Sequence, residues 1–195
     1  MLGGVIRGKN VTLRIPVEAD LPAIDGWMAD PGVRRGGWLW HEPATLATWK
    51  ERLAEVAKER RQVLWTIDEG ESRIGLASIR LGSEGNDVVE LAGMALDPAA
   101  QGRGLGADAA LALHRYLFDY LNVRSTEAAL PIDNERARRI LARLGYDGYA
   151  RGTAVYFRDG AYADQLRLRF DREVWNERWG ASEREYEPHP PEASL

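Results

Sequence analysis

The sequence predicts a single domain of the α+β class that is built on one mixed β-sheet. Segments with strand and helix periodicity follow one another in the order β-α-α-β-β-β-α-β-α-β-β, which combines hairpins with crossover helices. The chain has 195 residues, of which 45% are hydrophobic and 29% are charged. These values are ordinary for a folded domain with one core, and they exclude global disorder and collagen-like repeats.

The first third of the chain predicts one strand and two helices. Residues 5–15 alternate sufficiently for a strand, and residues 21–28 carry apolar side chains at helical spacing after Asp20. A loop rich in Gly and Trp is expected over residues 34–43. Residues 44–61 return to helical spacing and predict the second helix.

Strand periodicity replaces helical periodicity in the middle of the chain. Residues 63–67, 72–81 and 87–96 have the pattern of strands. Short polar turns that contain Gly separate them. We therefore expect three antiparallel neighbours joined by hairpins.

A second helical region and a final hairpin complete the domain. A long helix with one apolar face follows a Gly-rich loop, and residues 124–130 predict the next strand. A helix over residues 134–144 is expected to end at Gly145. Residues 149–157 and 162–170 predict the closing hairpin.

The last part of the chain changes in composition. Trp175 and Trp179 fit one more helical turn, so the predicted domain covers residues 1–180. Residues 181–195 form an acidic, Pro-containing tail that we expect to be disordered.

Charge and residue usage exclude several classes of function. The net charge of −4 arises after residue 170, where seven acids outnumber three bases, so broad electrostatic binding to nucleic acid has no support. The chain has no Cys, which excludes disulfides, thiolate metal sites and Cys nucleophiles, and no metal-binding cluster is evident. No apolar run is long enough to span a membrane, and the first residues lack a secretory signal. We therefore expect a cytoplasmic protein without a membrane partner.

The loop before the long helix carries the clearest chemical signal. Gly102, Gly104 and Gly106 occupy alternate positions between a predicted strand and a predicted helix. Glycines let the backbone approach a ligand, and the N–H groups of the first helical turn attract anions. The pattern favours a pyrophosphate-binding loop, with a plain Gly-rich turn as the alternative.

Two nucleotide-binding motifs compete for this loop. Residues 102–107 match G-x-G-x-x-A, but that dinucleotide fingerprint requires a parallel βαβ unit and an acid about 20 residues later. Here the preceding strands are expected to be antiparallel, and Glu127 comes somewhat late. A Gly-Lys-Ser/Thr sequence is absent, so the loop is not a Walker A motif. The better match is Q-x-x-G-x-G, filled by Gln101, Gly104 and Gly106.

With Q-x-x-G-x-G the chain resembles the GNAT superfamily of N-acetyltransferases, and in particular the branch of the ribosomal-protein alanine N-acetyltransferases. Four motifs in order, within residues 5–175, carry the resemblance. Besides the loop, they are residues 11–14 with Glu18-Ala19-Asp20, the N-x-x-[SA]…L-G-[FY] helix at residues 134–146, and Arg158-Asp159-Gly160…Asp164. The resemblance implies a mixed, mostly antiparallel central sheet of about seven strands flanked by about four helices. It also implies acetyl transfer from acetyl-CoA to an amine, and it allows a homodimer.

The resemblance implies where acetyl-CoA would bind. The backbone of Met94, Ala95 and Leu96 would pair with the pantetheine arm, and the Met94 or Leu96 N–H would polarise the thioester carbonyl. The loop would hold the pyrophosphate. The loop residues in this set are Gln101, Gly102, Arg103, Gly104, Leu105, Gly106 and Ala107.

The helix after the next strand would complete the donor site. Asn134 would contact the pantetheine arm near the thiol, and the same side chain suits the N-cap of the helix. Arg138 or Arg139 would reach the adenosine phosphate. The alternative for these arginines is a solvated helix face.

Glu90 is the candidate catalytic base, because the attacking amine must be neutral. It lies six residues before Leu96, where several members of the family carry a catalytic glutamate. A two-residue period would place it on the same strand face as Ala92, Met94 and Leu96. The alternative is an exposed carboxylate at a strand end.

The group that protonates the leaving thiolate is not assigned by the sequence. Many relatives have a tyrosine where this chain has Leu141. Tyr146, Tyr156 and Tyr162 are possible substitutes, although aromatic residues in strands are usually core. Otherwise water or the amine itself supplies the proton. His114 lies on an apolar helix face, where a structural role is expected.

Selection of the acceptor is expected in the Trp-containing loop. Trp38 and Trp40 would form a platform, with His41 or Glu42 recognising an amine; alternatively the tryptophans pack the loop onto the sheet. The sequence leaves the acceptor amine open. Without Cys, direct attack in a ternary complex is the expected route. A non-catalytic acyl-CoA-binding module and a dinucleotide-binding domain are the competing hypotheses.

Overall fold

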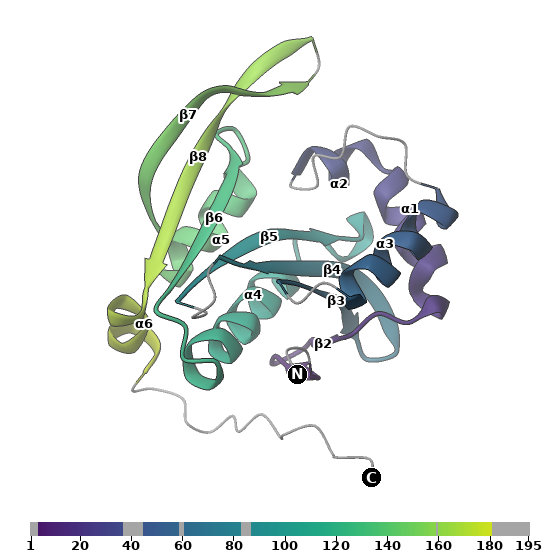
Figure 1. Cartoon of the computed structure of the whole chain (residues 1–195), viewed down its shortest axis with the longest axis horizontal. Helices are drawn as coiled ribbons and strands as arrows, with labels where there is room; N and C mark the ends of the chain where they lie inside the picture. Colours follow the sequence, from purple (N-terminus) through teal and green to yellow (C-terminus); the bar gives the residue numbers. More distant parts are fainter. Residues whose placement is uncertain (1–3, 37–44, 59–60, 83–86, 159, 181–195) are drawn as a thin grey trace.

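The computed structural model describes residues 4–36, 45–58, 61–82, 87–158 and 160–180. Eight strands form one sheet in the order β1-β2-β3-β4-β5-β6-β8-β7 (Figure 1). The strands are β1 (Ile6–Arg7), β2 (Thr12–Arg14), β3 (Gln62–Glu69), β4 (Ser72–Leu81), β5 (Val88–Leu96), β6 (Ser125–Pro131), β7 (Asp147–Arg158) and β8 (Ala161–Asp171). The α-helices in this part of the chain are α1 (Leu21–Ala29), α2 (Pro31–Gly36), α3 (Leu46–Lys58), α4 (Leu105–Arg115), α5 (Glu135–Leu144) and α6 (Arg172–Trp179). Single turns η1 (Glu18–Asp20), η2 (Pro98–Ala100) and the π-helical η3 (Tyr116–Tyr120) complete the set.

The topology confirms the predicted α+β class. Every neighbouring pair of strands is antiparallel except β5 and β6, which are parallel and are joined through α4. The hairpins β3–β4, β4–β5 and β7–β8 were expected. The parallel pair β5–β6 agrees with the mixed sheet and crossover helices that the sequence predicts, although the sequence did not indicate which two strands would be parallel. The unit β5–α4–β6 is therefore a βαβ crossover inside a mostly antiparallel sheet.

The first predicted strand, residues 5–15, is two short strands instead of one. Between β1 and β2 the Gly8 N–H donates to the Val11 carbonyl at 2.8 Å. The backbone N–H groups of Lys9 and Asn10 donate to the carboxylate of Asp108 on α4 at 2.8 and 2.6 Å. A side chain almost 100 positions away thus holds this turn, which no local pattern could indicate.

The predicted loop over residues 34–43 begins as a helix. The carboxylate of Asp30 accepts the N–H groups of Gly32 and Val33 at 2.7 and 3.1 Å, which caps α2. Val33 is buried and anchors this helix to the core. The rest of the loop, from residue 37, lies outside the described residues, as does the tail from residue 181.

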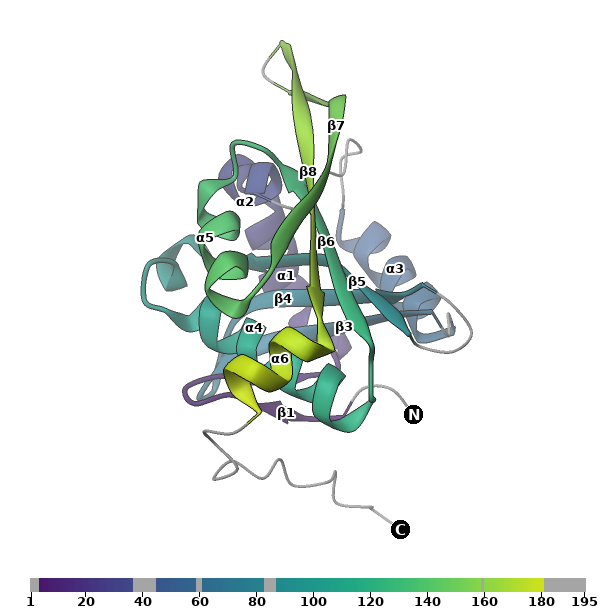
Figure 2. The ribbon, with the colours of Figure 1, turned by 90° about the vertical axis from the view of Figure 1, so that its left-hand side faces the viewer.

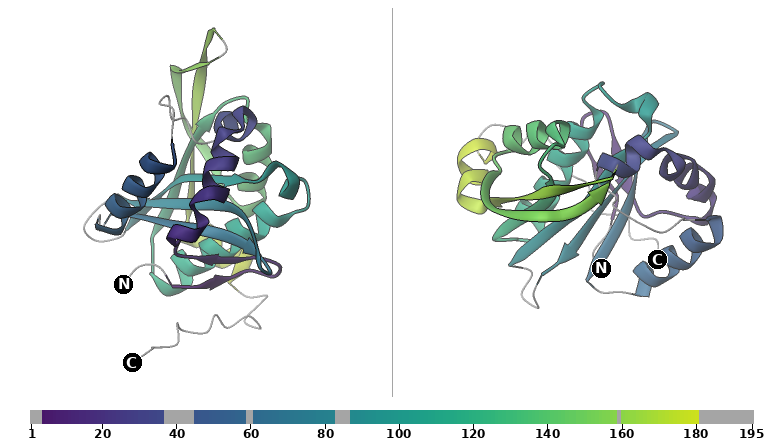
Figure 3. Two further views of the ribbon diagram at one scale, coloured as in Figure 1. Left: turned by 90° about the vertical axis from the view of Figure 1, so that its right-hand side faces the viewer. Right: turned by 90° about the horizontal axis from the view of Figure 1, so that it is seen from above.

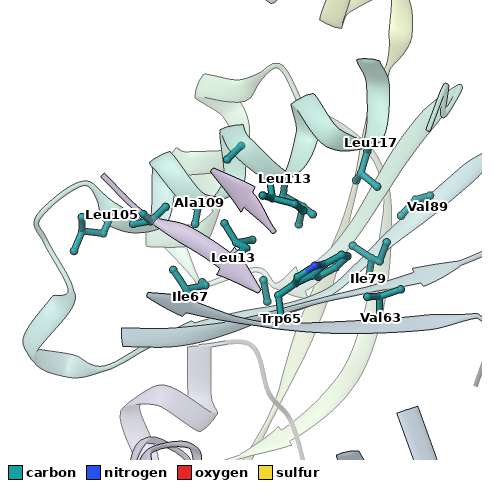
Figure 4. Close-up of a cluster of buried hydrophobic side chains, with 14 of the residues drawn as sticks. Leu13, Val63, Trp65, Ile67, Ile79, Val89, Leu105, Ala109, Leu113 and Leu117 are labelled. Carbon is teal, nitrogen blue, oxygen red and sulfur yellow. The ribbon is translucent and has the colours of Figure 1, made fainter. Parts of the chain in front are cut away.

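Helices cover both faces of the sheet. On one face Leu105, Ala109, Leu113 and Leu117, four residues apart, pack against strand side chains that include the fully buried Trp65 (Figure 4). On the other face α1 and α3 pack over β3 and β4 (Figure 3). Successive side chains of β3 point to alternate faces of the sheet. Nearly all of them are buried, because β3 is an interior strand with a hydrophobic core on both sides.

A third cluster joins α5 and α6 to β6 and β8. Phe118 and Trp175 stack in its centre and Phe170 meets both rings edge-on, with ring centroids 5.2 to 6.2 Å apart. The hairpin β7–β8 runs on beyond this cluster and projects from the body of the domain in both views (Figures 1 and 2). Phe157 and Tyr162 form an exposed ring pair near its end.

A buried carboxylate links β2 to β4 within the sheet through two arginines. Asp20 has no exposed surface. It accepts two hydrogen bonds from Arg14 at 2.8 and 2.9 Å, one from Arg73 at 2.7 Å and one from the Val17 N–H at 2.8 Å. Burial alone would raise the pKa of Asp20, but these donors hold it well below its usual range. Together, the two arginines and the backbone donor compensate for the burial of this charge.

A second buried polar network lies between α4 and β6. The Nδ1 atom of His114 donates to the Ala110 carbonyl at 2.6 Å. Its Nε2 atom lies 2.7 Å from the Tyr146 hydroxyl, which in turn lies 2.7 Å from the Thr126 hydroxyl. Burial lowers the pKa of His114 to about 4 and raises the pKa of Tyr146. His114 is therefore neutral at pH 7 and lies in a buried network, as expected for a residue with a structural role.

Replacing Asp20 with Asn removes one charge from a buried cluster and leaves Arg14 and Arg73 without their shared anion. We expect Asp20→Asn to lower the free energy of unfolding by about 3 kcal/mol in urea titrations at pH 7. Asp25→Asn, on the adjacent helix, is the control and should change stability by less than about 0.5 kcal/mol. Equal losses in the two variants would contradict the central role of Asp20.

The buried His114 predicts a pH dependence of stability. Because its pKa is lower in the folded state than the usual 6.5, the unfolded chain takes up a proton first as the pH falls. The contribution of neutral His114 to the free energy of unfolding is fully present above pH 6.5. It decreases by about 3 kcal/mol as the pH falls to 4. The His114→Gln variant should lack this part of the slope when unfolding is compared at pH 7.5 and 4.5. An identical slope would show that His114 is not the group responsible.

Candidate functional site

The sheet opens between β5 and β6. The two strands pair from Val88 and Ser125 to Leu91 and Ala128, and the pairing then stops. β5 continues to Leu96 along β4 alone. The β6-facing edge of its last residues therefore has no strand partner in the described part of the chain. We call this opening the strand fork.

A cavity of about 690 Å³ occupies the strand fork. Its walls are the open edge of β5, the small side chains of Ala128 and Ala129, the start of α4 and the first turns of α5. Asp30, before α2, lines the opposite end. The volume is that of a typical small-molecule site. The cavity reaches from α4 and α5 to the start of α2, where Gly32 and Val33 line it with Asp30.

The Gly-rich loop lies between the end of β5 and α4. Gly102 and Gly104 have φ angles of +79° and +84°, which favour glycine, and Gly104 is the N-cap of α4. The Ala107 and Asp108 N–H groups both donate to the Gly104 carbonyl at 3.1 Å. The N–H groups before them in this first turn have no backbone acceptor among the described residues. They are donors for an anion, with the helix dipole behind them.

Gly106 serves a different purpose from the two preceding glycines. A Cβ at this position would lie 3.2 Å from Cδ1 of Leu96 and 3.9 Å from Cδ1 of Ile140. The absence of a side chain lets α4 approach both β5 and α5. The loop therefore reaches the mouth of the cavity, which Gly106 lines.

Gln101 ties the loop to the strand. Its amide N–H donates to the Leu96 carbonyl at 3.0 Å, and its amide oxygen accepts a hydrogen bond from Arg136. This side chain therefore fixes the end of β5 and also orients an arginine of α5. Both Gln101 and Arg136 line the cavity.

Arg103 projects away from the loop towards the β3–β4 turn. Its guanidinium donates to both carboxylate oxygens of Glu69 at 2.8 and 2.7 Å. From the sequence, a phosphate contact is expected for Arg103. In the structure the same group already has an anionic partner. Leu105 and Ala107 lie in the first turn behind the loop, with Leu105 buried in the core.

Asn134 lines the cavity and caps α5. Its side-chain oxygen accepts the Ala137 N–H at 3.1 Å, as the N-cap interpretation requires. Arg138 points elsewhere and donates to the Ile132 carbonyl at 3.4 Å. Arg136 and Arg139 are the arginines of α5 that line the cavity. Arg139 is one of the two arginines expected at this site, whereas Arg136, in the first turn of the helix, is not among the residues expected there.

The face on which Glu90 lies was predicted wrongly. Ser78 pairs with Gly93 and Ile79 with Leu91, so Ala92 is an extra residue that forms a β-bulge. A bulge inverts the alternation of side chains. The register therefore places Glu90 on the face of Arg80 and Ser78, opposite to the face of Met94 and Leu96.

A second glutamate accompanies Glu90 at the closed end of the strand fork. Glu127 of β6 is its register partner, so the two carboxylates lie on the same face. Each has its own donor: Arg80 donates to Glu90 at 3.0 Å, and the Tyr149 hydroxyl donates to Glu127 at 3.1 Å. Arg169 lies 3.7 Å from Glu127. The sequence offered no signal for this pairing, because it depends on the parallel register.

The tyrosines considered as proton donors lie outside the cavity lining. Tyr146 is buried in the His114 network. The Tyr156 hydroxyl accepts a hydrogen bond from Gln165 at 2.7 Å, and Tyr162 is 69% exposed on the projecting hairpin. Leu141, by contrast, lines the cavity.

The proposed acceptor residues Trp38, Trp40, His41 and Glu42 lie outside the described residues. In the part of the chain that is described, no helix is long and apolar enough to cross a membrane. Within the described residues there is also no group of three His, Asp or Glu side chains placed to hold a metal ion.

The sequence matches one family model, and the fold is similar to several solved structures. The model of the acetyltransferase (GNAT) domain family matches residues 10–147. No curated protein sequence matches. The fold is similar to that of spermidine N-acetyltransferase from Vibrio cholerae in complex with CoA and spermine. The TM-score is 0.78 and the identity 17%, covering 85% of this chain and 98% of that one.

Two further solved structures resemble the chain. Mycobacterium smegmatis RimJ in complex with CoA-disulfide has a TM-score of 0.73 and 20% identity, covering 88% of this chain and 87% of RimJ. A putative acetyltransferase from T. thermophilus has a TM-score of 0.71 and 25% identity, covering 91% and 94% of the two chains. Similarity at this level of identity establishes the fold, and the family model covers most of the chain.

Proposed function

The chain belongs to the GNAT acetyltransferase family, and on this basis we propose that it transfers the acetyl group of acetyl-CoA to a primary amine by direct attack in a ternary complex. The supporting observation is the strand fork that ends at a loop of N–H donors. The fork offers an extended backbone edge, and the loop offers an anion site at the end of that edge. A ligand with an amide-containing arm and a pyrophosphate matches both.

The residues of this chain fit the donor. The open edge of β5, with Met94, Ala95 and Leu96, would pair with the pantetheine arm as an added strand. The first-turn N–H groups of α4 would hold the pyrophosphate, since Gly102 and Gly104 leave the loop surface clear of side chains. Arg136 would add a positive charge at the cavity wall. Acetyl-CoA supplies a thioester whose carbonyl carbon is open to attack by an amine.

Glu90 would accept the proton of the amine. Its carboxylate is partly exposed, with 39% of the side-chain surface accessible, and it lies one residue before the strand fork opens. The bulge turns it towards the face of the sheet on which α1 and α3 pack, and Glu90 itself is not among the residues that line the cavity, although the next residue, Leu91, is. An acceptor that approaches over this face would pass its proton to the carboxylate through one water molecule.

The proton for the leaving thiolate would come from water or from the amine. Leu141 lines the cavity and has no proton to donate. The same residue supports the second candidate, a non-catalytic acyl-CoA-binding module with this fold. That candidate predicts donor binding without turnover of any amine.

The acceptor class we propose is a primary amine on a protein N-terminus or on a small molecule. The similar structures include a spermidine N-acetyltransferase, whereas the sequence motifs resemble those of the ribosomal-protein alanine N-acetyltransferases. The fold does not select between these two kinds of acceptor. A screen should therefore contain both a peptide with an N-terminal alanine and spermidine.

Calorimetric titration with acetyl-CoA, CoA and NADH tests the donor site. We expect micromolar binding of acetyl-CoA and CoA, because an extended arm and a pyrophosphate are both recognised, and no heat from NADH. Binding of NADH without CoA would favour the dinucleotide interpretation of the loop. If none of the three ligands binds, the proposed donor site is wrong, and only the family and the fold remain established.

Replacing Glu90 with Gln tests the catalytic proposal. We expect the rate of acetylation at pH 7.5 to fall about a hundredfold, with the Kd of acetyl-CoA unchanged. The deficit should shrink above pH 9, because more of the acceptor amine is then already neutral. Glu51→Gln, an exposed position on α3, is the matched control. A variant with the wild-type rate would exclude Glu90 as the base.

A further inference from the structure

The Gly-rich loop carries an arginine whose charge is already neutralised. Arg103 lies between Gly102 and Gly104, the two glycines with positive φ. Its guanidinium makes a bidentate pair with Glu69 at 2.8 and 2.7 Å. Glu69 is the last residue of β3, and the turn Gly70–Glu71 follows it. A turn 34 residues earlier in the chain therefore places a carboxylate beside the anion-binding loop.

A second arginine beside the loop has a different kind of partner. Arg136 donates to the neutral amide oxygen of Gln101, so its positive charge is not compensated by that contact. Arg103 faces a full negative charge. The two arginines therefore contribute unequally to the attraction of phosphate, and Glu69 causes the difference.

The Arg103–Glu69 pair is exposed enough to exchange partners. The side chains are 52% and 31% exposed. Water competes for both groups at such exposure, so the pair is weak, and a phosphate offers the guanidinium the same bidentate geometry.

Removal of the Glu69 carboxylate is expected to strengthen the binding of a polyphosphate whether or not Arg103 moves to the ligand. If the guanidinium moves to the phosphate, the pair with Glu69 must first break, which weakens binding. If it stays on Glu69, the pair is neutral overall and the positive charge of Arg103 does not attract the ligand. In both cases the chain without this carboxylate binds a polyphosphate more tightly.

We propose that Glu69 is a positioning residue that competes with the pyrophosphate of CoA for Arg103 and so weakens the binding of donor and product. This inference rests on the proposed function, because it takes the loop to be the CoA site. Weaker binding promotes release of CoA after each turnover. The affinity of the loop for CoA is therefore lower than it would be without the Glu69 carboxylate.

The test is a calorimetric measurement of the Kd of CoA for the wild type and Glu69→Gln. It is made in about 0.3 M NaCl, where the screening length is about 6 Å and long-range repulsion is small. We expect the Kd of the variant to be lower by about three- to fivefold. Glu71→Gln, in the same turn and exposed, is the matched control and should leave the Kd unchanged.

A double variant identifies the route of the effect. In the Arg103→Gln background, the Glu69→Gln change should no longer lower the Kd, because the competing guanidinium is gone. Dephospho-CoA lacks the ribose phosphate. If Arg103 reaches the pyrophosphate, Glu69→Gln should bind this ligand more tightly than the wild type does, by the same factor as for CoA. Loss of the gain with that ligand would assign Arg103 to the ribose phosphate and overturn the pyrophosphate assignment.

Three results would overturn the inference. They are an unchanged or raised Kd in Glu69→Gln, the same gain in Glu71→Gln, and a full gain without Arg103. Each variant is first checked by thermal unfolding, so a folding defect is not mistaken for lost affinity. Failure of the wild type to bind CoA would remove the proposed function itself, whereas wild-type binding without a gain removes only the role of Glu69.

Discussion

The early separation of β5 from β6 is the constraint on which the site depends. An interior strand normally satisfies its N–H and C=O groups on both edges. Here the pairing ends at Leu91, and β5 continues for five more residues with one edge open to the cavity. An unpaired edge inside a protein favours a ligand that supplies the missing hydrogen bonds. The cavity therefore exists because the sheet is incomplete at this point.

Close packing on both sides keeps β5 from closing the gap. Gly75 lies opposite Leu96, and a Cβ there would collide with the Ala95 carbonyl oxygen, so β4 and β5 approach as closely as their backbones allow. Gly106 lets α4 approach Leu96 from the other direction, where a Cβ would lie 3.2 Å from Cδ1 of Leu96. The end of β5 is held between β4 and α4. The strand fork is therefore fixed by packing and does not depend on a bound ligand.

Local patterns predicted most of the elements, and the failures share one physical cause. Helical spacing, strand alternation and glycine placement depend on near neighbours, so the Gly-rich loop and its helix could be located from the sequence. The β-bulge at Ala92 reverses the side on which Glu90 lies, and it is defined only by the partner strand. The break between β1 and β2 depends on Asp108, and the pairing of Glu90 with Glu127 depends on the parallel register. Such features arise from contacts between distant segments, which periodicity cannot report.

The charges of the site follow the same logic. Residues 1–170 are neutral overall, which gives no hint of an anion-binding surface. The fold then decides which charges remain available: Arg136 meets a neutral amide, whereas Arg103 meets the carboxylate of Glu69. Two arginines of equal formal charge thus contribute differently to one loop. Because the compensating group comes from the β3–β4 turn, the affinity of the loop for phosphate can change without any change in the loop itself. Selection on a surface turn can therefore adjust ligand release while the glycines that shape the loop stay fixed.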